Sequence, residues 1–283
     1  MSKSEGKYDQ RNKLNDLTGK EWLQFTKSFW MSEKCADDKV AMQHPAPFLI
    51  KDTQKLISMF TKKGMTVFDP FCGSGTTLIS ACNIGRMGIG IDLNKNFSML
   101  ALERLNNLGY KKNKDFKYFV GDSFKEIDLV NSVDYIVTSP PYHNILKNKG
   151  KGIRENKQEK GFRHGGRVGV EYYSDDDEYD LGNKEKYSEF INALEKIMHK
   201  CYLKLNNKKY CTIVISDFTV NKKEISVQGD IVKMMERVGF EFSGTTILLQ
   251  NSKPLYPFGY PYAYKINHHH QNLITFRKVV ESE

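Results

Sequence analysis

The chain has 283 residues, 39% of them hydrophobic and 27% charged, and its 43 Lys and Arg against 34 Asp and Glu give a net charge of +9. A chain of this length can bury one large core, and no apolar run approaches the roughly 20 residues that a membrane-spanning helix needs. The polar N-terminus lacks the apolar segment of a signal peptide, so we expect a soluble, cytoplasmic protein whose positive charge suits a polyanionic partner.

The predicted elements alternate regularly once a polar N-terminal extension, residues 1–43, has ended. Residues 21–30 of this extension have the pattern of a short amphipathic helix. Seven strands are predicted, at residues 65–69, 87–92, 116–120, 133–137, 210–216, 240–250 and 271–278. Helices are predicted at residues 49–61, 76–84, 95–108, 185–205 and 228–238.

The connections between these elements indicate how the strands pair. Strands joined through helices should be parallel, whereas the last two are joined by a loop and should pair antiparallel. The sequence therefore predicts an α/β fold with a seven-stranded, mostly parallel sheet and an antiparallel last strand. Such a sheet binds its ligand at the carboxyl ends of the strands, near the point where the strand order reverses.

One long segment, residues 143–183, interrupts the alternation and has little periodicity. Its first part, residues 143–170, carries eight Lys and Arg against two Glu, whereas residues 171–180 hold six acidic side chains and three tyrosines. A loop of this length inside a compact domain is commonly functional or disordered. It is therefore a candidate lid over the site, with a solvated loop as the alternative.

A glycine-rich turn joins the first predicted strand to its helix, with the sequence Asp69-Pro-Phe-Cys-Gly-Ser-Gly-Thr76. The glycines at positions 73 and 75 let the backbone turn sharply and approach a ligand closely, and the following helix presents free N–H groups. The turn lacks the Gly-Lys-Ser/Thr of a phosphate-binding loop and the full GxGxxG of a dinucleotide site. It is either a ligand-binding loop of another kind or a tight turn without a ligand.

Acidic residues end the next two predicted strands. Asp92 follows Gly-Ile-Gly-Ile, where an acid can accept hydrogen bonds from both hydroxyls of a ribose. Asp122 follows Val-Gly, where a carboxylate can receive the amino group of an adenine. Either acid alone could instead be a helix N-cap or a turn residue. With the glycine turn, however, they place three candidate ligand groups along one edge of the sheet.

Together these residues resemble the cofactor motifs of the S-adenosylmethionine-dependent amino-methyltransferases of DNA. The resemblance implies a Rossmann-like methyltransferase fold over residues 44–283 and S-adenosylmethionine as cofactor. In that family the loop borders the methionine portion of the cofactor, the first acid holds the ribose, the second contacts the adenine, and a segment matching residues 44–48 contacts the methionine end. The cofactor-binding residues that the resemblance implies are Phe48, Asp69, Phe71, Gly73, Ser74, Gly75, Thr76, Asp92, Asp122 and Ser123.

The sequence Ser139-Pro140-Pro141-Tyr142 follows the fourth predicted strand and resembles the catalytic motif of the same family. The exocyclic amine of a base is a poor nucleophile because its lone pair is delocalised into the ring, so an enzyme must hold its N–H groups with acceptors. The Ser139 side chain and a backbone carbonyl within the two prolines are such acceptors, and the prolines hold them in place. Tyr142 offers a flat face for stacking on a base that has left the duplex. Alone, the four residues would also fit a rigid turn.

The residue before Pro-Pro-Tyr bears on the target base. In the resembling family Asp or Asn there commonly accompanies adenine-N6 methylation, whereas Ser, as at position 139, is more typical of cytosine-N4 methylation. We therefore favour a site-specific DNA methyltransferase acting on N4 of a flipped-out cytosine over an adenine-N6 enzyme. Methylation of cytosine C5 needs a cysteine nucleophile after this strand, and none lies between Cys82 and Cys201. Methylation of RNA or of a protein glutamine, and a non-catalytic binding protein with this fold, are the alternatives.

The order of the motifs, cofactor loop first, departs from the commoner arrangement for enzymes with Ser-Pro-Pro-Tyr and leaves no room between them for a large recognition domain. We therefore predict that the insertion at residues 143–183 contacts double-stranded DNA through Lys and Arg on phosphates. The predicted contacts are Lys147, Lys149, Lys151, Arg154, Arg163 and Arg167. If a cognate restriction endonuclease exists, we expect it to act independently.

Residues 255–262, Leu-Tyr-Pro-Phe-Gly-Tyr-Pro-Tyr, and the three histidines at 268–270 lie in the loop before the last predicted strand. Aromatic side chains between Pro and Gly could form a base-recognition surface or a packed corner, and the sequence favours neither. Adjacent histidines rarely all reach one ion, and the five cysteines show no CxxC pair or metal-finger spacing. No metal is therefore expected.

Overall fold

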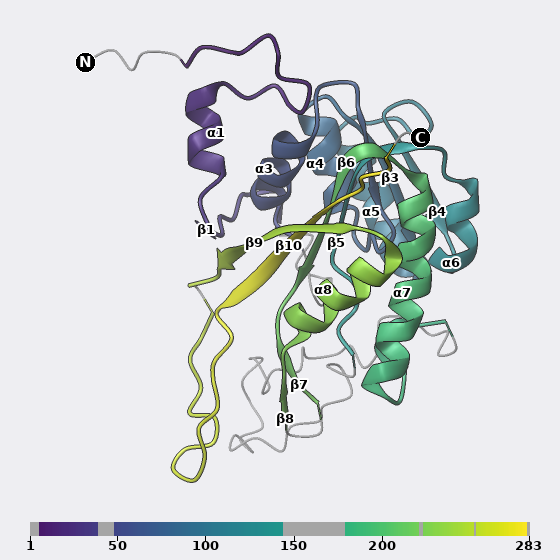
Figure 1. Ribbon diagram of the computed structural model, residues 1–283. Helices are drawn as coiled ribbons and strands as arrows, with labels where there is room; N and C mark the ends of the chain where they lie inside the picture. Colours follow the sequence, from purple (N-terminus) through teal and green to yellow (C-terminus); the bar gives the residue numbers. More distant parts are fainter. Residues whose placement is uncertain (1–5, 39–47, 144–178, 221–222, 252, 282–283) are drawn as a thin grey trace.

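The computed structural model of the chain describes residues 6–38, 48–143, 179–220, 223–251 and 253–281 (Figure 1). Its strands are β1 (Phe29–Met31), β2 (Thr66–Asp69), β3 (Met87–Asp92), β4 (Phe116–Val120), β5 (Val133–Thr138), β6 (Leu205–Ile215), β7 (Phe218–Val220), β8 (Lys223–Ile225), β9 (Glu241–Leu249) and β10 (His270–Arg277). Its helices are α1 (Gly19–Phe25), α3 (Ile50–Phe60), α4 (Thr76–Asn83), α5 (Lys95–Asn107), α6 (Ser123–Glu126), the short 3-10 helices η1 (Ile127–Leu129) and η2 (Leu181–Asn183), α7 (Tyr187–Lys204) and α8 (Val227–Val238).

Eight of these strands form one sheet, in the order β1-β9-β10-β6-β5-β2-β3-β4, while β7 and β8 form a separate hairpin. β10 is antiparallel to both of its neighbours, β6 and β9, and the other neighbouring strands are parallel. The mostly parallel sheet with an antiparallel last strand is thus confirmed. β2 lies between β3 and β5, so the strand order reverses there, and sheets of this kind open their binding crevice at the carboxyl ends beside such a point.

The sheet has eight strands instead of the predicted seven because β1 joins its edge beside β9. The helix predicted at residues 21–30 is shorter, since α1 ends at Phe25 after starting from a capping box between Thr18 and Glu21. The chain then enters β1, where only Trp30 is buried. A strand of three residues is too short for an alternating pattern to show in the sequence.

Helices cover both faces of the sheet (Figure 1). α7 and α8 pack on one face, where Leu194 and Met235 meet strand residues such as Ile136 and Ile213. α3 and α4 cover the opposite face, to which Tyr135 contributes. Neighbouring residues of β5 therefore enter different layers, as the two-residue period of a strand requires.

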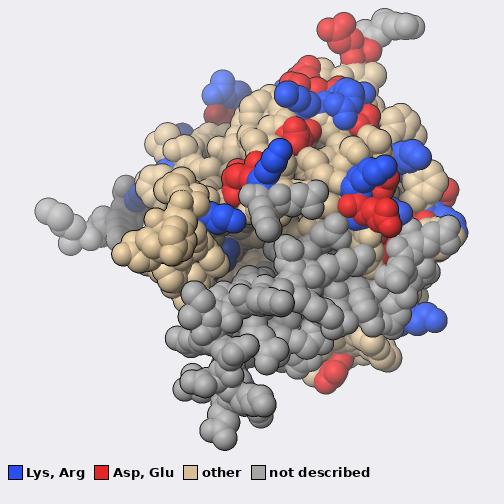
Figure 2. All heavy atoms as spheres, turned by 90° about the horizontal axis from the view of Figure 1, so that it is seen from below, with Lys and Arg blue, Asp and Glu red and all other residues tan. Residues whose placement is uncertain are grey.

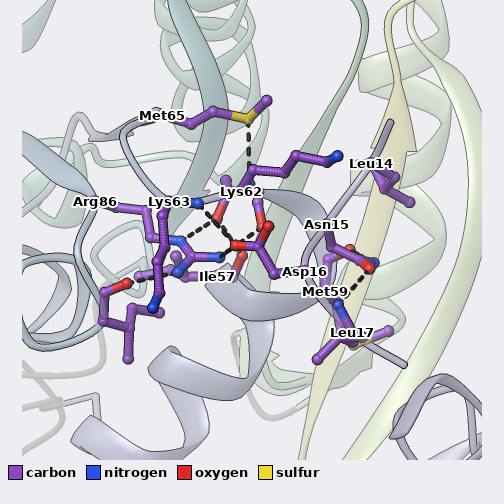
Figure 3. Close-up of polar contacts among 12 residues, drawn as sticks. Leu14, Asn15, Asp16, Leu17, Ile57, Met59, Lys62, Lys63, Met65 and Arg86 are labelled. Carbon is purple, nitrogen blue, oxygen red and sulfur yellow. Dashed lines mark hydrogen bonds and ion pairs between the residues drawn. The ribbon is translucent and has the colours of Figure 1, made fainter. Parts of the chain in front are cut away.

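The segment before α1 is held against α3 and the loop after α4 (Figure 3). Asn15 Nδ2 donates a hydrogen bond to the Met59 carbonyl at 2.7 Å. Asp16 Oδ2 lies 3.0 Å from Arg86 Nη2, which also donates to the Thr61 carbonyl at 2.8 Å. Because the Arg86 side chain is buried, it needs such partners, and they fix this segment to the body that carries the sheet.

Candidate active site

The loop after β2, residues 69–76 (hereafter the glycine loop), begins at a carboxylate enclosed by the protein. Asp69 is 2% exposed and accepts hydrogen bonds from Thr77 Oγ1 at 2.5 Å, from Thr138 Oγ1 at 2.6 Å and from the Phe71 N–H at 3.0 Å. Burial raises the pKa of Asp69 to about 6. Since Thr138 ends β5, Asp69 joins the glycine loop to the strand that precedes Ser139.

Two glycines give the loop its shape. Gly73 has a φ of 50°; its N–H donates to Asp92 Oδ2 at 2.7 Å and its carbonyl accepts from the Tyr118 hydroxyl at 2.8 Å. Gly75, at a φ of 79°, is the N-cap of α4, and a Cβ there would lie 2.8 Å from the Cβ of Ala101. The loop therefore depends on glycine at both positions for its left-handed backbone, and at position 75 also for close packing.

Behind the loop lies a buried guanidinium. Arg104 Nη1 donates to the Ser74 carbonyl at 2.6 Å and to Thr76 Oγ1 at 3.1 Å. Burial lowers the pKa of Arg104. No motif in the sequence indicates Arg104, because its partners lie about 30 residues away on another element. Ser74 and Thr76, two predicted cofactor residues, thus direct these polar atoms toward the protein.

The acid after β3 is held by backbone N–H groups on both of its oxygens. Asp92 Oδ2 accepts from the Gly73 N–H, and Oδ1 accepts from the Asn94 N–H at 2.9 Å. Burial raises the pKa of Asp92 to about 6, and the negative charges of Asp69 and Asp180 add to this increase. This carboxylate is oriented before any ligand binds.

The acid after β4 serves as a helix cap and faces the same site. Asp122 is the N-cap of α6 and accepts from the Phe124 N–H at 2.9 Å. The neighbouring Ser123 Oγ donates to the Pro70 carbonyl at 2.5 Å, which ties the end of β4 to the glycine loop. Capping, the alternative considered from the sequence, is therefore present alongside a position in the cavity wall.

A cavity brings the cofactor motifs and the catalytic motif together. Its lining includes seven of the residues predicted from the sequence, namely Phe71, Asp92, Asp122, Ser123, Ser139, Pro140 and Pro141. The other predicted residues within the described chain stand outside this lining: Phe48, Asp69, Gly73, Ser74, Gly75, Thr76 and Tyr142. The glycine loop therefore supports the cavity mainly from behind, while the strand ends after β3, β4 and β5 form its wall.

Tyr142, the last residue of the catalytic motif, is buried and stands outside the cavity lining. It is 7% exposed, its ring packs edge-on against Phe218 at 5.9 Å between ring centroids, and its hydroxyl accepts a hydrogen bond from Gln271 Nε2 at 3.0 Å. These neighbours enclose the ring. The stacking of Tyr142 on a target base stays a prediction. Phe48 likewise packs against the core on the α3 side of the sheet.

Six residues of the lining are absent from the sequence prediction: Leu93, Phe97, Tyr179, Asp180, Leu181 and Ile197. Phe97 follows Asp92 in the first turn of a predicted helix, so its position could have been inferred. Asp180 is buried and caps η2, accepting from the Gly182 N–H at 2.8 Å. The end of the insertion at residues 143–183 thus closes one side of the cavity, which no local pattern indicates.

The charge of this cavity differs from that of the chain as a whole. Among the described residues that line it are three carboxylates, those of Asp92, Asp122 and Asp180, and neither Lys nor Arg, although the chain carries a net charge of +9. A partly enclosed wall of one sign attracts the opposite charge. The cavity is therefore suited to a ligand that carries positive charge.

Several predicted features lie outside the described residues. These are the segment at residues 44–47 and the six predicted DNA contacts, Lys147, Lys149, Lys151, Arg154, Arg163 and Arg167. Within the described ranges, no group of three or more His, Cys, Asp or Glu is placed to hold a metal ion. Nor is any helix in that part of the chain long and apolar enough to cross a membrane.

Solved structures of methyltransferases share this fold. TrmN from Thermus thermophilus matches with a TM-score of 0.51 and 14% identity over 86% of this chain and 52% of that one. An S-adenosylmethionine-dependent O-methyltransferase from Thermotoga maritima matches with a TM-score of 0.51 and 16% identity over 87% of this chain and 72% of that one. At these identities the likeness shows the fold alone, and it confirms the predicted Rossmann-like methyltransferase fold.

Shorter stretches match characterised relatives. The chain is 43% identical over 75 residues to the orphan methyltransferase M.BamHII of Bacillus amyloliquefaciens, covering 26% of this chain and 28% of that protein. It is 33% identical over 104 residues to the type II methyltransferase M.BglI of Bacillus subtilis, covering 36% and 28%. A tRNA (guanine(10)-N2)-dimethyltransferase of Methanocaldococcus jannaschii is 36% identical over 115 residues, covering 38% and 32%. The matches thus span less than a third of these relatives.

Family models extend over more of the chain. One described as an RMKL-like methyltransferase domain matches residues 58–155. Another, for N6 and N4 methyltransferases and described as DNA methylase, matches residues 2–103 and 133–279. Because the second match covers most of the length, including both motifs that carry the resemblance, this chain belongs to the DNA methylase family of N6 and N4 methyltransferases.

Proposed function

We propose that the protein transfers a methyl group from S-adenosylmethionine to the exocyclic N4 of a flipped-out cytosine in DNA. One observation carries the proposal: the acids after β3 and β4, Asp92 and Asp122, share a cavity with Ser139 and Pro140 after β5. The residues that we assign to the cofactor and those that we assign to the amine therefore line the same cavity. Membership of the DNA methylase family supports both the reaction and the substrate.

The cavity fits S-adenosylmethionine in charge and in the kind of groups it offers. Asp92 would hold the ribose hydroxyls, because its two oxygens are already aimed by the N–H groups of Gly73 and Asn94. Asp122 would receive the adenine amino group, with Phe71 and Phe97 as apolar neighbours in the lining. When bound, the cofactor supplies an electrophilic methyl group on a positively charged sulfonium, a charge that the carboxylates of this wall favour.

We propose that the catalytic motif prepares an amine for attack. Ser139 Oγ and the Pro140 carbonyl would accept hydrogen bonds from the two N–H bonds of the exocyclic amine, which leaves its lone pair directed into the cavity. The two prolines limit the motion of these acceptors. Asp69 fixes the strand end beneath them through its bond to Thr138. The nitrogen would take the methyl carbon as the bond from that carbon to the cofactor's sulfur breaks, so that the sulfur would leave as a neutral thioether. The proton that the nitrogen loses would pass through the hydrogen-bonded acceptors to solvent.

The target base is proposed from a single residue. Ser139 precedes Pro-Pro-Tyr, which favours cytosine N4 over adenine N6 by resemblance to the family. The identity with a protein named tRNA (guanine(10)-N2)-dimethyltransferase gives RNA as the second candidate substrate. The predicted phosphate contacts, Lys147 to Arg167, support a nucleic-acid substrate by their charge. We propose that any cognate restriction endonuclease acts as a separate protein.

One experiment tests both the reaction and the base. Unmethylated plasmid DNA is incubated with the full-length protein and S-adenosylmethionine, digested to nucleosides, and analysed by mass and retention time. We expect N4-methylcytosine. N6-methyladenine would keep the enzyme class and overturn the base assignment. A methylated base only in a parallel incubation with tRNA would overturn DNA as the substrate.

A further inference from the structure

The loop between β9 and β10 extends from the end of the molecule where the parallel strands finish (Figure 1). In this aromatic loop, residues 253–268, the side chains of Tyr260, Tyr262 and Tyr264 are 81%, 94% and 89% exposed. The sequence left a packed corner and a recognition surface as equal alternatives, and these exposures exclude the packed corner. A cluster of large exposed apolar groups marks an interaction surface.

The loop holds its own shape without burying these rings. At its base, Asn267 Oδ1 accepts from the Tyr256 N–H at 3.0 Å and Asn267 Nδ2 donates to the Tyr256 carbonyl at 2.8 Å. At its tip, the N–H groups of Tyr262 and Ala263 donate to the Gly259 carbonyl at 2.8 and 2.7 Å. Gly259 has a φ of 76°, and a Cβ there would lie 2.2 Å from the Ala263 carbonyl oxygen. The tyrosines are thus presented on a folded turn, which lowers the entropy lost on binding.

Hydrogen bonds connect the base of the loop to the catalytic motif. Gln250 Nε2 donates to Gln271 Oε1 at 3.0 Å, and Gln271 Nε2 donates to the Tyr142 hydroxyl at 3.0 Å. Gln250 directly follows β9, and Gln271 is the second residue of β10, so both lie where the strands lead into and out of the loop. The strand ends from which the aromatic loop extends are therefore connected to the motif that carries Ser139.

The charge of the aromatic loop indicates which class of macromolecule it binds. Residues 253–268 contain Lys253 and Lys265 and no acidic residue. In Figure 2, which views the molecule from below Figure 1, the lobe on the left, where this loop lies, is largely free of charged side chains. Aromatic rings with scattered lysines suit nucleic-acid bases, because every base offers a flat face for stacking and its phosphate attracts a cation. A partner bound by charge alone would need a denser basic patch.

We propose that the aromatic loop binds DNA beside the target base. Tyr260, Tyr262 and Tyr264 would stack on the bases that are left exposed when the target base leaves the duplex. Extruding a base breaks its stacking with both neighbours, so an aromatic ring at that position replaces part of the lost contact. This inference rests on the proposed function, since only an enzyme that extrudes a base creates these exposed faces. It assigns substrate binding to a segment separate from the insertion at residues 143–183.

The test compares full-length variants in equilibrium binding to a short fluorescent duplex and in methyl transfer to plasmid DNA. Replacing all three tyrosines by Ala should weaken duplex binding by about 5- to 150-fold for each ring that stacks on a base, with unchanged affinity for S-adenosylmethionine. Replacing all three by Phe should preserve binding, because the rings remain. The matched control is Leu129→Ala with Leu203→Ala, which removes exposed apolar side chains near the amino ends of β5 and β6.

A second variant disturbs the loop without removing a ring. Gly259→Ala forces the tip to rearrange and should weaken duplex binding in the same direction as the triple Ala variant, while affinity for S-adenosylmethionine stays unchanged. If the triple Ala variant binds and methylates DNA like the wild type, the inference is wrong while the proposed function stands. If the wild type methylates no DNA, the proposed function itself fails. A loss of self-association with unchanged DNA binding would instead identify the tyrosines as a contact between copies of this chain.

Discussion

Two loops at the carboxyl end of the sheet use their side chains in opposite ways. The glycine loop directs polar groups inward, where Asp69 bonds to Thr77 and Thr138 and Thr76 bonds to Arg104. The aromatic loop directs its tyrosines outward into solvent. A loop whose polar groups form hydrogen bonds within the protein is fixed before a ligand binds, whereas exposed aromatic rings gain contacts only on binding. Changes in the first loop should therefore alter stability and cofactor affinity, and changes in the second should alter DNA binding alone.

The catalytic motif lies between these two regions, and Ser139→Ala should have the largest effect. Removing one oriented hydrogen-bonding group from a reacting centre lowers turnover by about 100- to 1,000-fold, so single-turnover methyl transfer should fall by that order. Affinity for S-adenosylmethionine, measured by calorimetry, should hardly change. Ser243→Ala, at an exposed position of β9, is the matched control. Equal losses of turnover and cofactor affinity would show that Ser139 shapes the cofactor site instead.

Asp69→Ala tests whether the glycine loop is held from within. The substitution leaves two buried threonine hydroxyls and the Phe71 N–H without their acceptor, and unsatisfied buried groups of this kind cost about 3 kcal/mol in the free energy of unfolding. Urea denaturation measures this loss. Glu103→Ala, at an exposed position of α5, should leave the midpoint unchanged. A stable Asp69→Ala protein that fails to bind the cofactor would place Asp69 in direct contact with it.

The sequence predicts the parts of the site that depend on local order and misses those that depend on distant packing. Asp92 and Asp122 follow strands with clear patterns, so their place at one edge of the sheet follows from the fold class. Arg104 and Asp180 reach the site from other segments, and only the folded chain brings them there. The sequence pattern could not predict the exposure of Tyr262 either, because aromatic residues between prolines fit a packed corner as well as an exposed surface.

Gly75→Ala separates the two demands placed on the glycine loop, left-handed backbone and close packing. Gly64 has a similar φ, 82° against 79°, but a Cβ at Gly64 would meet nothing within 4 Å. Gly64→Ala should therefore lower the free energy of unfolding by about 1 kcal/mol, the backbone cost alone. Gly75→Ala should lose about 1–3 kcal/mol more, because its Cβ meets Ala101 and the overpacked region must shift. Equal losses in the two variants would show that the contact with Ala101 relaxes freely.

The smallest effect is a dependence of cofactor affinity on pH. Burial raises the pKa of Asp92 to about 6, so this carboxyl is ionised at pH 7.5 and largely protonated at pH 5.5. Protonation removes a negative charge from the cavity wall that we propose binds the cationic cofactor. For one group with this pKa, affinity should fall about fourfold between these pH values. Calorimetry should show this fall in the wild type. In Asp92→Asn the affinity should be lower and should hardly change with pH.

Asp69 has the same pKa of about 6 but stands outside the cavity lining, so it provides the control for this measurement. Both carboxyls have a higher pKa in the folded than in the unfolded chain, so the folded protein binds more protons. Their contribution to stability therefore falls as pH rises from about 4 to 6. Their titration thus cannot explain weaker binding at low pH through loss of folded protein. The opposite result would be a pH dependence that survives in Asp92→Asn and disappears in Asp69→Asn. It would show that the charge of Asp69, and not that of Asp92, controls the pH dependence of cofactor affinity.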